Sequence, residues 1–145
     1  MKRLLLLFGF VLLMTSCSCS RDSDDEAIED YYLGSWELVQ MTGSFHGSET
    51  TGQDMEWQER YQFNKNGSFT KRRTTNSGTK EAQGTYYIRK LADEVTLMLR
   101  YPEDNDIVAS CISQHEEVLY FTDDKSLSGS WSACDGPGLL YKKVK

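Results

Sequence analysis

The clearest pattern along the chain is an alternation of apolar and polar side chains that begins near residue 33. The segment 55–63, MEWQERYQF, places Met55, Trp57, Tyr61 and Phe63 on one face and Glu56, Gln58, Arg60 and Gln62 on the other. A β-strand with one buried face requires this alternation, because successive side chains point to opposite sides of the sheet. We therefore predict a strand over 55–63.

The segments that follow predict more strands joined by short turns. The dipeptide Asn66–Gly67 is a strong hairpin signal, and Gly84 predicts a bulge or bend within its strand. The eight predicted strands cover 34–41, 55–63, 68–75, 79–90, 95–101, 107–113, 116–122 and 136–144. The sixth and seventh join near Gln114–His115, and 123–130 is expected to be a loop.

Eight short strands at regular spacing, each joined to the next, predict an all-β fold. We expect an eight-stranded antiparallel up-and-down β-barrel, and a sandwich is the alternative. Eight strands that close on themselves leave an interior just wide enough for side chains or for one small ligand. The pattern leaves a filled and a hollow barrel equally open.

The first residues follow a different pattern. Lys2 and Arg3 precede an uncharged, mostly apolar run over 4–14, which is too short for a bilayer core that needs about 20 helical residues. This arrangement is typical of a secretory signal peptide. The residues MTSC, which end at Cys17, resemble a bacterial lipobox with methionine where leucine is commoner.

The lipobox resemblance implies cleavage before Cys17 and attachment of acyl chains such as palmitate to this residue. An ordinary cleaved signal peptide is the alternative. Residues 20–30, SRDSDDEAIED, are dominated by acids and have too few apolar side chains to order themselves. We therefore predict a signal peptide over 1–16, a lipidated acidic disordered tether over 17–30 and a barrel domain over 31–145.

The acidic run behind Cys17 resembles an export signal of some Gram-negative lipoproteins, and a solvated spacer is the alternative. We expect a lipid anchor in the bacterial outer membrane, on its periplasmic or cell-surface face. The chain has 16 Lys and Arg against 22 Asp and Glu, a balance that argues against nucleic acid as a partner. The run KRR at 71–73 is expected on a solvated face, with an anion site as the alternative.

Two of the four cysteines lie within the predicted domain. Cys111 and Cys134 are predicted to form a disulfide, which would contribute about 3 kcal/mol in the chain-entropy model. A buried free thiol beside a loop cysteine is the alternative. Cys19 lies in the predicted tether.

Four segments together resemble a known family. LGSWELVQMTG is similar to the first-strand signature of lipocalins, with Gly34 and Trp36 as its Gly-x-Trp. With YQFNKNGSFT, GTYYI and CDGPGLLYKKV in this order, the chain resembles short lipocalin-like lipoproteins of Gram-negative bacteria over residues 31–145. The resemblance implies an eight-stranded calyx with Trp36 packed across the closed end.

The chain departs from the lipocalin pattern at two places. Lipocalins have a late arginine that stacks on the tryptophan, whereas the last strand here offers Lys142 and Lys143. The second signature, Thr-Asp-x-x-Tyr, is represented by Thr122 and Asp123 without the tyrosine.

Motifs for catalysis and metal binding are sparse. Only His46 and His115 are histidines, and neither has the closely spaced partners that a metal site needs. No Gly-x-Ser-x-Gly or Gly-rich phosphate loop occurs. The acid pairs Glu56 with Glu59 and Asp104 with Asp106 are expected by chance in such an acidic chain. We therefore expect no enzyme activity, no metal and no cofactor.

Two kinds of function remain. A binding module would hold a small hydrophobic or amphipathic ligand in the calyx, lined by Trp57, Tyr61, Phe63, Tyr86 and Leu97. The alternative is a solid barrel whose loops 43–53 and 123–135 contact an envelope protein or a glycan, including contact that inhibits an enzyme.

Overall fold

The computed structural model describes residues 31–92, 94–122 and 125–145, which fold mainly as β-strands. The elements are β1 (Gly34–Thr42), β2 (Thr50–Thr51), the 3₁₀ turn η1 (Gly52–Asp54), β3 (Gln58–Phe63), β4 (Ser68–Thr75), β5 (Gly78–Leu91), β6 (Glu94–Arg100), β7 (Glu116–Phe121), β8 (Leu127–Gly129), the 3₁₀ turn η2 (Trp131–Cys134) and β9 (Gly138–Lys143). Among the described residues, no helix has the length and apolar character needed to cross a membrane.

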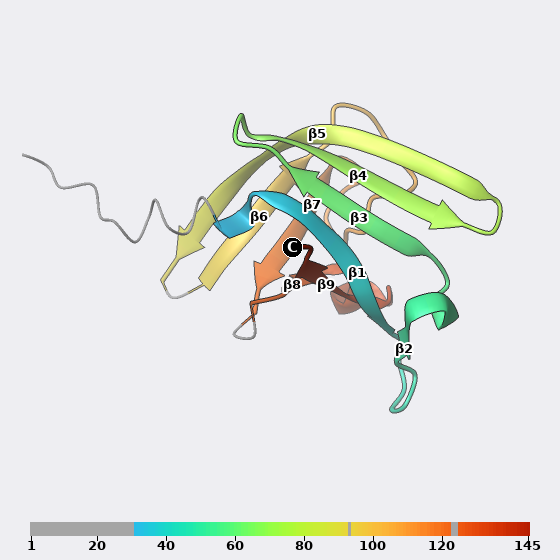
Figure 1. The fold of residues 1–145 in the computed structure, drawn as a ribbon. Helices are drawn as coiled ribbons and strands as arrows, with labels where there is room; N and C mark the ends of the chain where they lie inside the picture. The colour runs from blue at the N-terminus through green and yellow to red at the C-terminus, as the bar shows by residue number, and fades with distance from the viewer. Residues whose placement is uncertain (1–30, 93, 123–124) are drawn as a thin grey trace, which may run out of the picture.

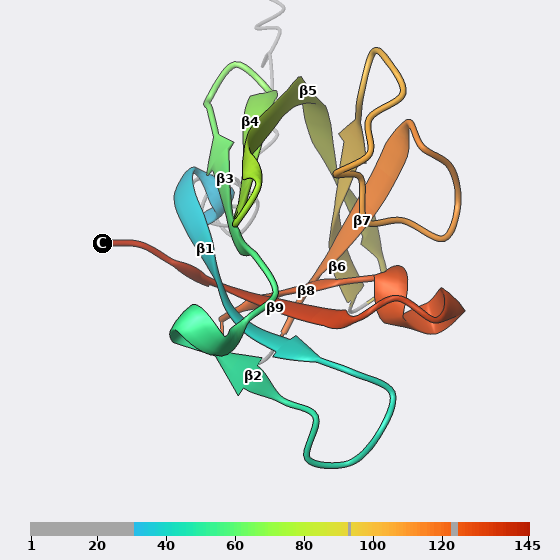
Figure 2. The same cartoon turned by 90° about the vertical axis from the view of Figure 1, so that its right-hand side faces the viewer.

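Eight of these strands close into a barrel. In the order β1-β3-β4-β5-β6-β7-β8-β9, each strand pairs antiparallel with the next, and β9 pairs back with β1. The strands therefore form the ring seen in Figure 2, and β2 adds two residues alongside β1. This arrangement confirms the prediction of an all-β, eight-stranded, antiparallel up-and-down barrel.

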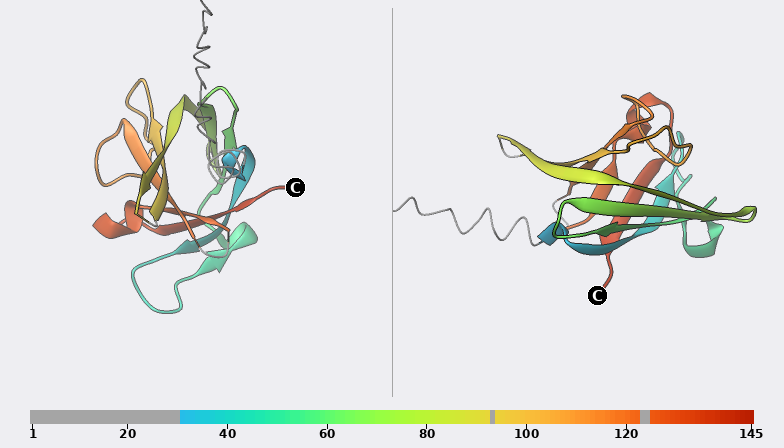
Figure 3. Two further views of the ribbon diagram at one scale, coloured as in Figure 1. Left: turned by 90° about the vertical axis from the view of Figure 1, so that its left-hand side faces the viewer. Right: turned by 90° about the horizontal axis from the view of Figure 1, so that it is seen from above.

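The two ends of the barrel contain different turns and connections. The end that we name the base contains Tyr31 and Tyr32 and the β3–β4, β5–β6 and β7–β8 turns. The end that we name the mouth contains the β4–β5 turn, η2 and the connection 101–115 between β6 and β7. Figures 1 and 3 show the start of β1 and the β4–β5 turn toward opposite ends of the molecule, so the described chain enters the barrel at the base.

An aromatic cluster closes the base. Trp36 is fully buried, and its Nε1 donates to the backbone oxygen of Tyr32 at 3.0 Å. Tyr31 packs edge-on against the Trp36 ring, and Lys143 Nζ lies 5.1 Å from the centroid of the Tyr31 ring. The structure thus places Trp36 at the base, and Lys143 lies over the ring of the neighbouring Tyr31. Gly34 begins β1 with a φ of 104°, a conformation that favours glycine.

One of the eight predicted strands is wrong. Residues 107–113 lie in the connection 101–115, and β6 pairs directly with β7, so the predicted turn near Gln114–His115 joins no hairpin. The missing barrel strand is β8, inside the segment predicted as a loop. Ile107 and Ala109 are apolar because both side chains are buried at the mouth. They do not belong to a strand of the barrel. β8 escaped prediction because three residues with serine and glycine carry little strand propensity.

Gly84 lies in β5 without a bulge in the pairing to β4. The register runs unbroken from Ser68↔Thr85 to Thr75↔Gly78. A Cβ at residue 84 would lie 2.0 Å from the backbone oxygen of Arg100 and 2.8 Å from the Phe69 ring. Glycine is required here because the neighbouring backbone approaches too closely for any side chain.

We expect Gly84→Ala to lower the free energy of unfolding by about 1–3 kcal/mol, because the added methyl overpacks the barrel wall. Urea unfolding followed by tryptophan fluorescence measures the change. The control is Gly43→Ala in the exposed loop after β1, where the added Cβ meets only the Ser48 side chain; it should shift stability by no more than about 0.5 kcal/mol. Equal losses in the two variants would contradict this account.

Candidate functional site

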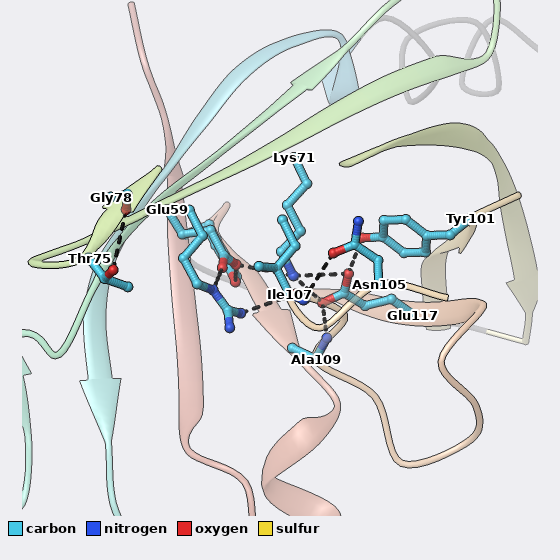
Figure 4. A network of polar contacts seen from close by, with 11 residues as sticks. Glu59, Lys71, Thr75, Gly78, Tyr101, Asn105, Ile107, Ala109 and Glu117 are labelled. Atoms are coloured by element: carbon cyan, nitrogen blue, oxygen red, sulfur yellow. Dashed lines mark hydrogen bonds and ion pairs between the residues drawn. The ribbon is translucent and has the colours of Figure 1, made fainter. Parts of the chain in front are cut away.

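Four charged side chains are buried inside the barrel near its mouth: Glu59 on β3, Lys71 and Arg73 on β4, and Glu117 on β7. The Lys71, Glu59 and Glu117 side chains have no exposed surface. Lys71 Nζ lies 2.9 Å from Glu117 Oε1 and 3.3 Å from Glu59 Oε1 (Figure 4). One ammonium therefore bridges carboxylates from non-adjacent strands, β3 and β7, of the barrel.

Each carboxylate also accepts other hydrogen bonds. Arg73 Nε and the Tyr141 hydroxyl donate to Glu59, the latter at 2.6 Å. Glu117 accepts from the Tyr101 hydroxyl and from the backbone N–H of Ala109. Buried charges require such pairing, because an unpaired one costs several kcal/mol. We name Glu59, Lys71, Arg73, Tyr101, Glu117 and Tyr141 the ion network.

The expectation that KRR lies on a solvated face is wrong for two of its three residues. Lys71 and Arg73 point into the barrel, and only Arg72 is exposed. The reason is strand parity, because β4 continues the inward alternation that begins at buried Phe69. The same parity puts Glu59 on the apolar face of β3. Charges of opposite sign at inward positions of two paired strands are the signal that could have revealed the network.

Burial controls the protonation of the tyrosines in this region. The pKa values of Tyr61, Tyr101 and Tyr141 lie well above the usual range, first because burial disfavours the phenolate and second because Glu59 and Glu117 repel it. Tyr101 and Tyr141 therefore remain neutral donors to the carboxylates. Burial alone lowers the pKa of Arg73, but the adjacent Glu59 carboxylate outweighs it, and the net pKa is raised.

The connection 101–115, which we name the mouth loop, folds against the ion network. Ile107 and Ala109 are buried in it. Arg73 Nη2 donates to the backbone oxygen of Ile107 at 3.2 Å, and the Ala109 N–H donates to Glu117 Oε1 at 3.2 Å. The backbone of the loop thus supplies one hydrogen bond to each of two buried charged groups of the network.

Two links hold the mouth loop in place, one at its neck and one within it. Tyr101 N–H donates to the backbone oxygen of His115 at 2.8 Å, which closes the neck of the loop. A disulfide joins Cys111 in the loop to Cys134 in η2. The predicted disulfide is therefore confirmed, and it connects the loop to the neighbouring connection across the mouth.

A cleft of about 370 Å³ opens beside the mouth loop. The Arg73 guanidinium lies 4.3 Å from the centroid of the Trp57 ring on its wall. The exposed pair Lys80 and Asp106 joins β5 to the loop, and the hydrogen bond from Lys80 lowers the pKa of Asp106. Trp57 Nε1 is buried and has no hydrogen-bond partner among the described residues. The cleft is lined by Glu56, Trp57, Arg73, Thr75, Ser77, Gly78, Thr79, Lys80, Asp106 and Ile107.

The five predicted ligand-lining residues pack within or against the barrel core: Trp57, Tyr61, Phe63, Tyr86 and Leu97. Only Trp57 lines the mouth cleft. The rings of Tyr61 and Phe63 stack at 5.6 Å between centroids, and Tyr86 packs edge-on against Phe63 at 5.0 Å. Tyr61 and Leu97 have no exposed surface, so no water-sized space touches them. At this depth the barrel is filled by its own side chains.

Two other hollows lack the features of the mouth cleft. One of about 640 Å³ lies at the base between Leu91, Val95 and Phe121. Another of about 280 Å³ lies on the outer wall beside the exposed Glu37–Arg60 ion pair. The mouth cleft differs from both because an aromatic ring, a buried guanidinium and a loop backbone converge there.

The members of the two acid pairs noted in the sequence have different surroundings. Glu59 is buried in the ion network, whereas Glu56 is exposed. Asp104 pairs with His115 at 2.9 Å, and Asp106 pairs with Lys80. Within the described ranges, no group of three or more His, Cys, Asp and Glu side chains could hold a metal ion.

Other predicted features lie on loops or outside the described residues. In the loop 43–53, Phe45 exposes 73% of its surface. The segment 123–135 contains β8 and η2, and its first two residues are not described. Cys17 and Cys19 lie outside the described residues, as do the predicted signal peptide and tether.

Comparison of the chain with known proteins finds no matching family model, no matching curated protein and no matching solved structure. Its function must therefore be inferred from the residues and the geometry of the mouth.

We expect Lys71→Met to lower the free energy of unfolding by about 3–5 kcal/mol, because it leaves buried carboxylates without their shared cation. The neighbouring Arg72→Met replaces an exposed cation and should change stability by no more than about 0.5 kcal/mol. Urea unfolding of both variants measures the difference. A Lys71→Met protein as stable as Arg72→Met would show that the network is not needed for folding.

Proposed function

We propose that this protein is a membrane-tethered, lipocalin-like binding protein that takes a small hydrophobic or amphipathic ligand at the mouth of its barrel. The observation that supports the proposal is the cleft where Trp57, Arg73 and Ile107 converge. Ligand sites combine apolar walls with a few placed polar groups in volumes of about 300–1,000 Å³. The mouth cleft has this size, and Trp57 and Ile107 form its apolar part among polar and charged lining residues.

The filled interior favours the mouth over the deeper calyx. Tyr61 and Leu97 occupy the space that a deep ligand would need. At the mouth, an apolar group would pack on Trp57 and Ile107, and a polar group would face Arg73. Because Arg73 is already held by Glu59 and the Trp57 ring, it is preorganised for such contact.

A second candidate is contact with an envelope protein or a glycan. It is favoured by two large apolar side chains on loops of the mouth end, Phe45 and Ile112, which expose 73% and 62% of their surface. Binding residues commonly lie on loops that a rigid scaffold holds in place. This candidate predicts that binding depends on these loop residues and not on the cleft.

We expect Trp57→Leu to weaken ligand binding about tenfold or more, because it removes the ring on which both Arg73 and an apolar ligand would pack. Native mass spectrometry of the purified protein detects a bound ligand, and titration with a fluorescent fatty acid measures affinity. Phe45→Leu, outside the cleft, should bind as the wild type does. No uptake by the folded wild type would contradict the proposal, and loss only in Phe45→Leu would favour the second candidate.

The tether in the proposal comes from the lipobox resemblance at Cys17. The described chain enters the barrel at the base, opposite the mouth. A lipid anchor ahead of residue 31 would therefore leave the mouth cleft accessible on the side away from the membrane. Stable anchoring takes about two acyl chains. The lipobox resemblance implies at least this many on Cys17.

We expect Cys17→Ser to abolish incorporation of labelled palmitate and to release the protein from the membrane fraction. Cys19→Ser is the matched control, because it changes a cysteine two residues away and should leave both properties intact. A Cys17→Ser protein that still carries label in the membrane fraction would overturn the anchor assignment.

A further inference from the structure

The base of the barrel carries an apolar surface that the described chain leaves uncovered. A hollow of about 640 Å³ opens there between Leu91, Val95 and Phe121. Leu91 exposes 71% of its surface, and Val95 and Phe121 are partly exposed where they pack against the core. One exposed leucine is ordinary on a protein surface. Here the leucine borders an open hollow with two more apolar side chains, and contiguous apolar surface of this kind marks contact with a protein or a membrane.

This surface lies at the most projecting part of the base. Leu91 is the last residue of β5, and β5 extends past the other strands at this end of the molecule in Figures 1 and 3. Val95 lies near the start of β6, and Phe121 ends β7. The apolar side chains therefore come from the ends of three adjacent strands, at the part of the base that would reach a flat surface first.

A polar rim joins the hollow to the start of the described chain. The Tyr31 ring packs edge-on against Phe121 at 5.0 Å between centroids, and the Tyr31 hydroxyl donates to the backbone oxygen of Lys125 at 3.2 Å. Lys143 Nζ donates to the backbone oxygen of Tyr31 at 2.6 Å, and Lys125 also lines the hollow. Tyrosine and lysine suit the boundary between acyl chains and headgroups, because each has an apolar body and a polar end.

The base carries charges of both signs. Lys125, Lys143 and Glu94 are exposed, and the sequence adds aspartates at positions 93, 123 and 124, which lie outside the described residues. Ammonium groups attract phosphates, and carboxylates attract amines. A zwitterionic headgroup holds both a phosphate and an amine, so it complements this mixture better than a layer of anionic lipids does.

The predicted tether would keep this surface near the membrane. Residues 17–30 separate the end of the predicted signal peptide from Tyr31, and 14 residues span at most about 50 Å when fully extended. The lipid surface would therefore stay within this distance of the base, which raises its effective concentration there. A contact too weak to hold the free protein on a membrane becomes sufficient in the anchored one.

We infer that the base docks on the zwitterionic lipid surface that holds the anchor. Leu91 would insert at the boundary of the acyl chains, with Tyr31, Lys125 and Lys143 at the level of the headgroups. This inference rests on the membrane tether of the proposed function and adds an orientation to it. The barrel would stand on its base, and the mouth cleft would face away from the lipid.

The test places a tryptophan reporter at either end of the lipidated full-length protein. Leu91→Trp and Phe45→Trp are a matched pair, because residues 91 and 45 expose 71% and 73% of their surface, one at the base and one on a loop of the mouth end. Each protein is reconstituted in vesicles of phosphatidylethanolamine and of phosphatidylcholine brominated near the top of its acyl chains.

Bromine quenches tryptophan fluorescence near contact. We expect the brominated lipid to quench at least half of the emission that Leu91→Trp adds to the wild type, because interfacial side chains reach about 5–10 Å into the boundary of headgroups and acyl chains. The emission that Phe45→Trp adds should not change. Equal quenching of the two reporters, or none of either, would overturn the inference.

Salt separates apolar docking from ionic adsorption. At about 0.5 M salt, interactions between exposed charges are screened within a few ångström, whereas apolar contact persists. Quenching of Leu91→Trp should therefore be the same in low and high salt. Its loss in high salt would contradict insertion of the apolar residue.

Other occupants of the base would give a different signal. If a second copy of the protein or the chain's own residues 17–30 covered the base, the Leu91→Trp emission would shift to the blue without quenching by brominated lipid. That result would show that the protein, not the lipid, covers this surface, and the inference would be wrong.

The outcomes also separate the inference from the proposed function. If palmitate labelling depends on Cys17 but Leu91→Trp is not quenched, the docking is overturned, and the tether and the mouth cleft stand. If Leu91→Trp is quenched but the wild type takes up no fatty acid, the ligand site fails and the docking stands. If the protein carries no lipid, the tether fails and the inference fails with it.

Discussion

The buried ammonium of Lys71 is the constraint on which the mouth half of the barrel depends. It lies between the carboxylates of Glu59 and Glu117, and loss of any of these three charges would leave another without compensation. A shift of β4 by one residue would turn Lys71 outward and place Arg72 inside. The network therefore adds an electrostatic penalty against strand slippage to the usual hydrophobic one.

The same network explains why a loop lies folded into the mouth. The strand side chains and the hydroxyls of Tyr101 and Tyr141 satisfy most of the charged groups, but Arg73 and Glu117 still contact backbone atoms of residues 107 and 109. Trp57 then covers the face of the Arg73 guanidinium. Charge, ring and loop backbone meet at one place because inward positions of β3, β4 and β7 converge there.

The barrel was predictable from local pattern, and the site was not. Alternation and turn residues identify seven of the barrel strands, and the pair Cys111–Cys134 follows from its placement in the domain. Lys71 and Glu117 lie 46 residues apart, so no local pattern reveals that one neutralises the other. Likewise, Ile107 and Ala109 alternate as a strand does, but their partner is a set of buried charges. Whether Cys17 carries lipid stays a prediction.

The position of the disulfide has a consequence for when the barrel is completed. Cys111 and Cys134 enclose β7 and β8, and β8, at three residues, is the shortest strand of the ring. The cytosol keeps thiols reduced, whereas the bacterial periplasm oxidises them. With the signal peptide that the first residues predict, the chain would cross the inner membrane before this cross-link forms. The disulfide that encloses the shortest strand of the ring would then form only after export. The chain would therefore lack this cross-link during export and gain it afterwards.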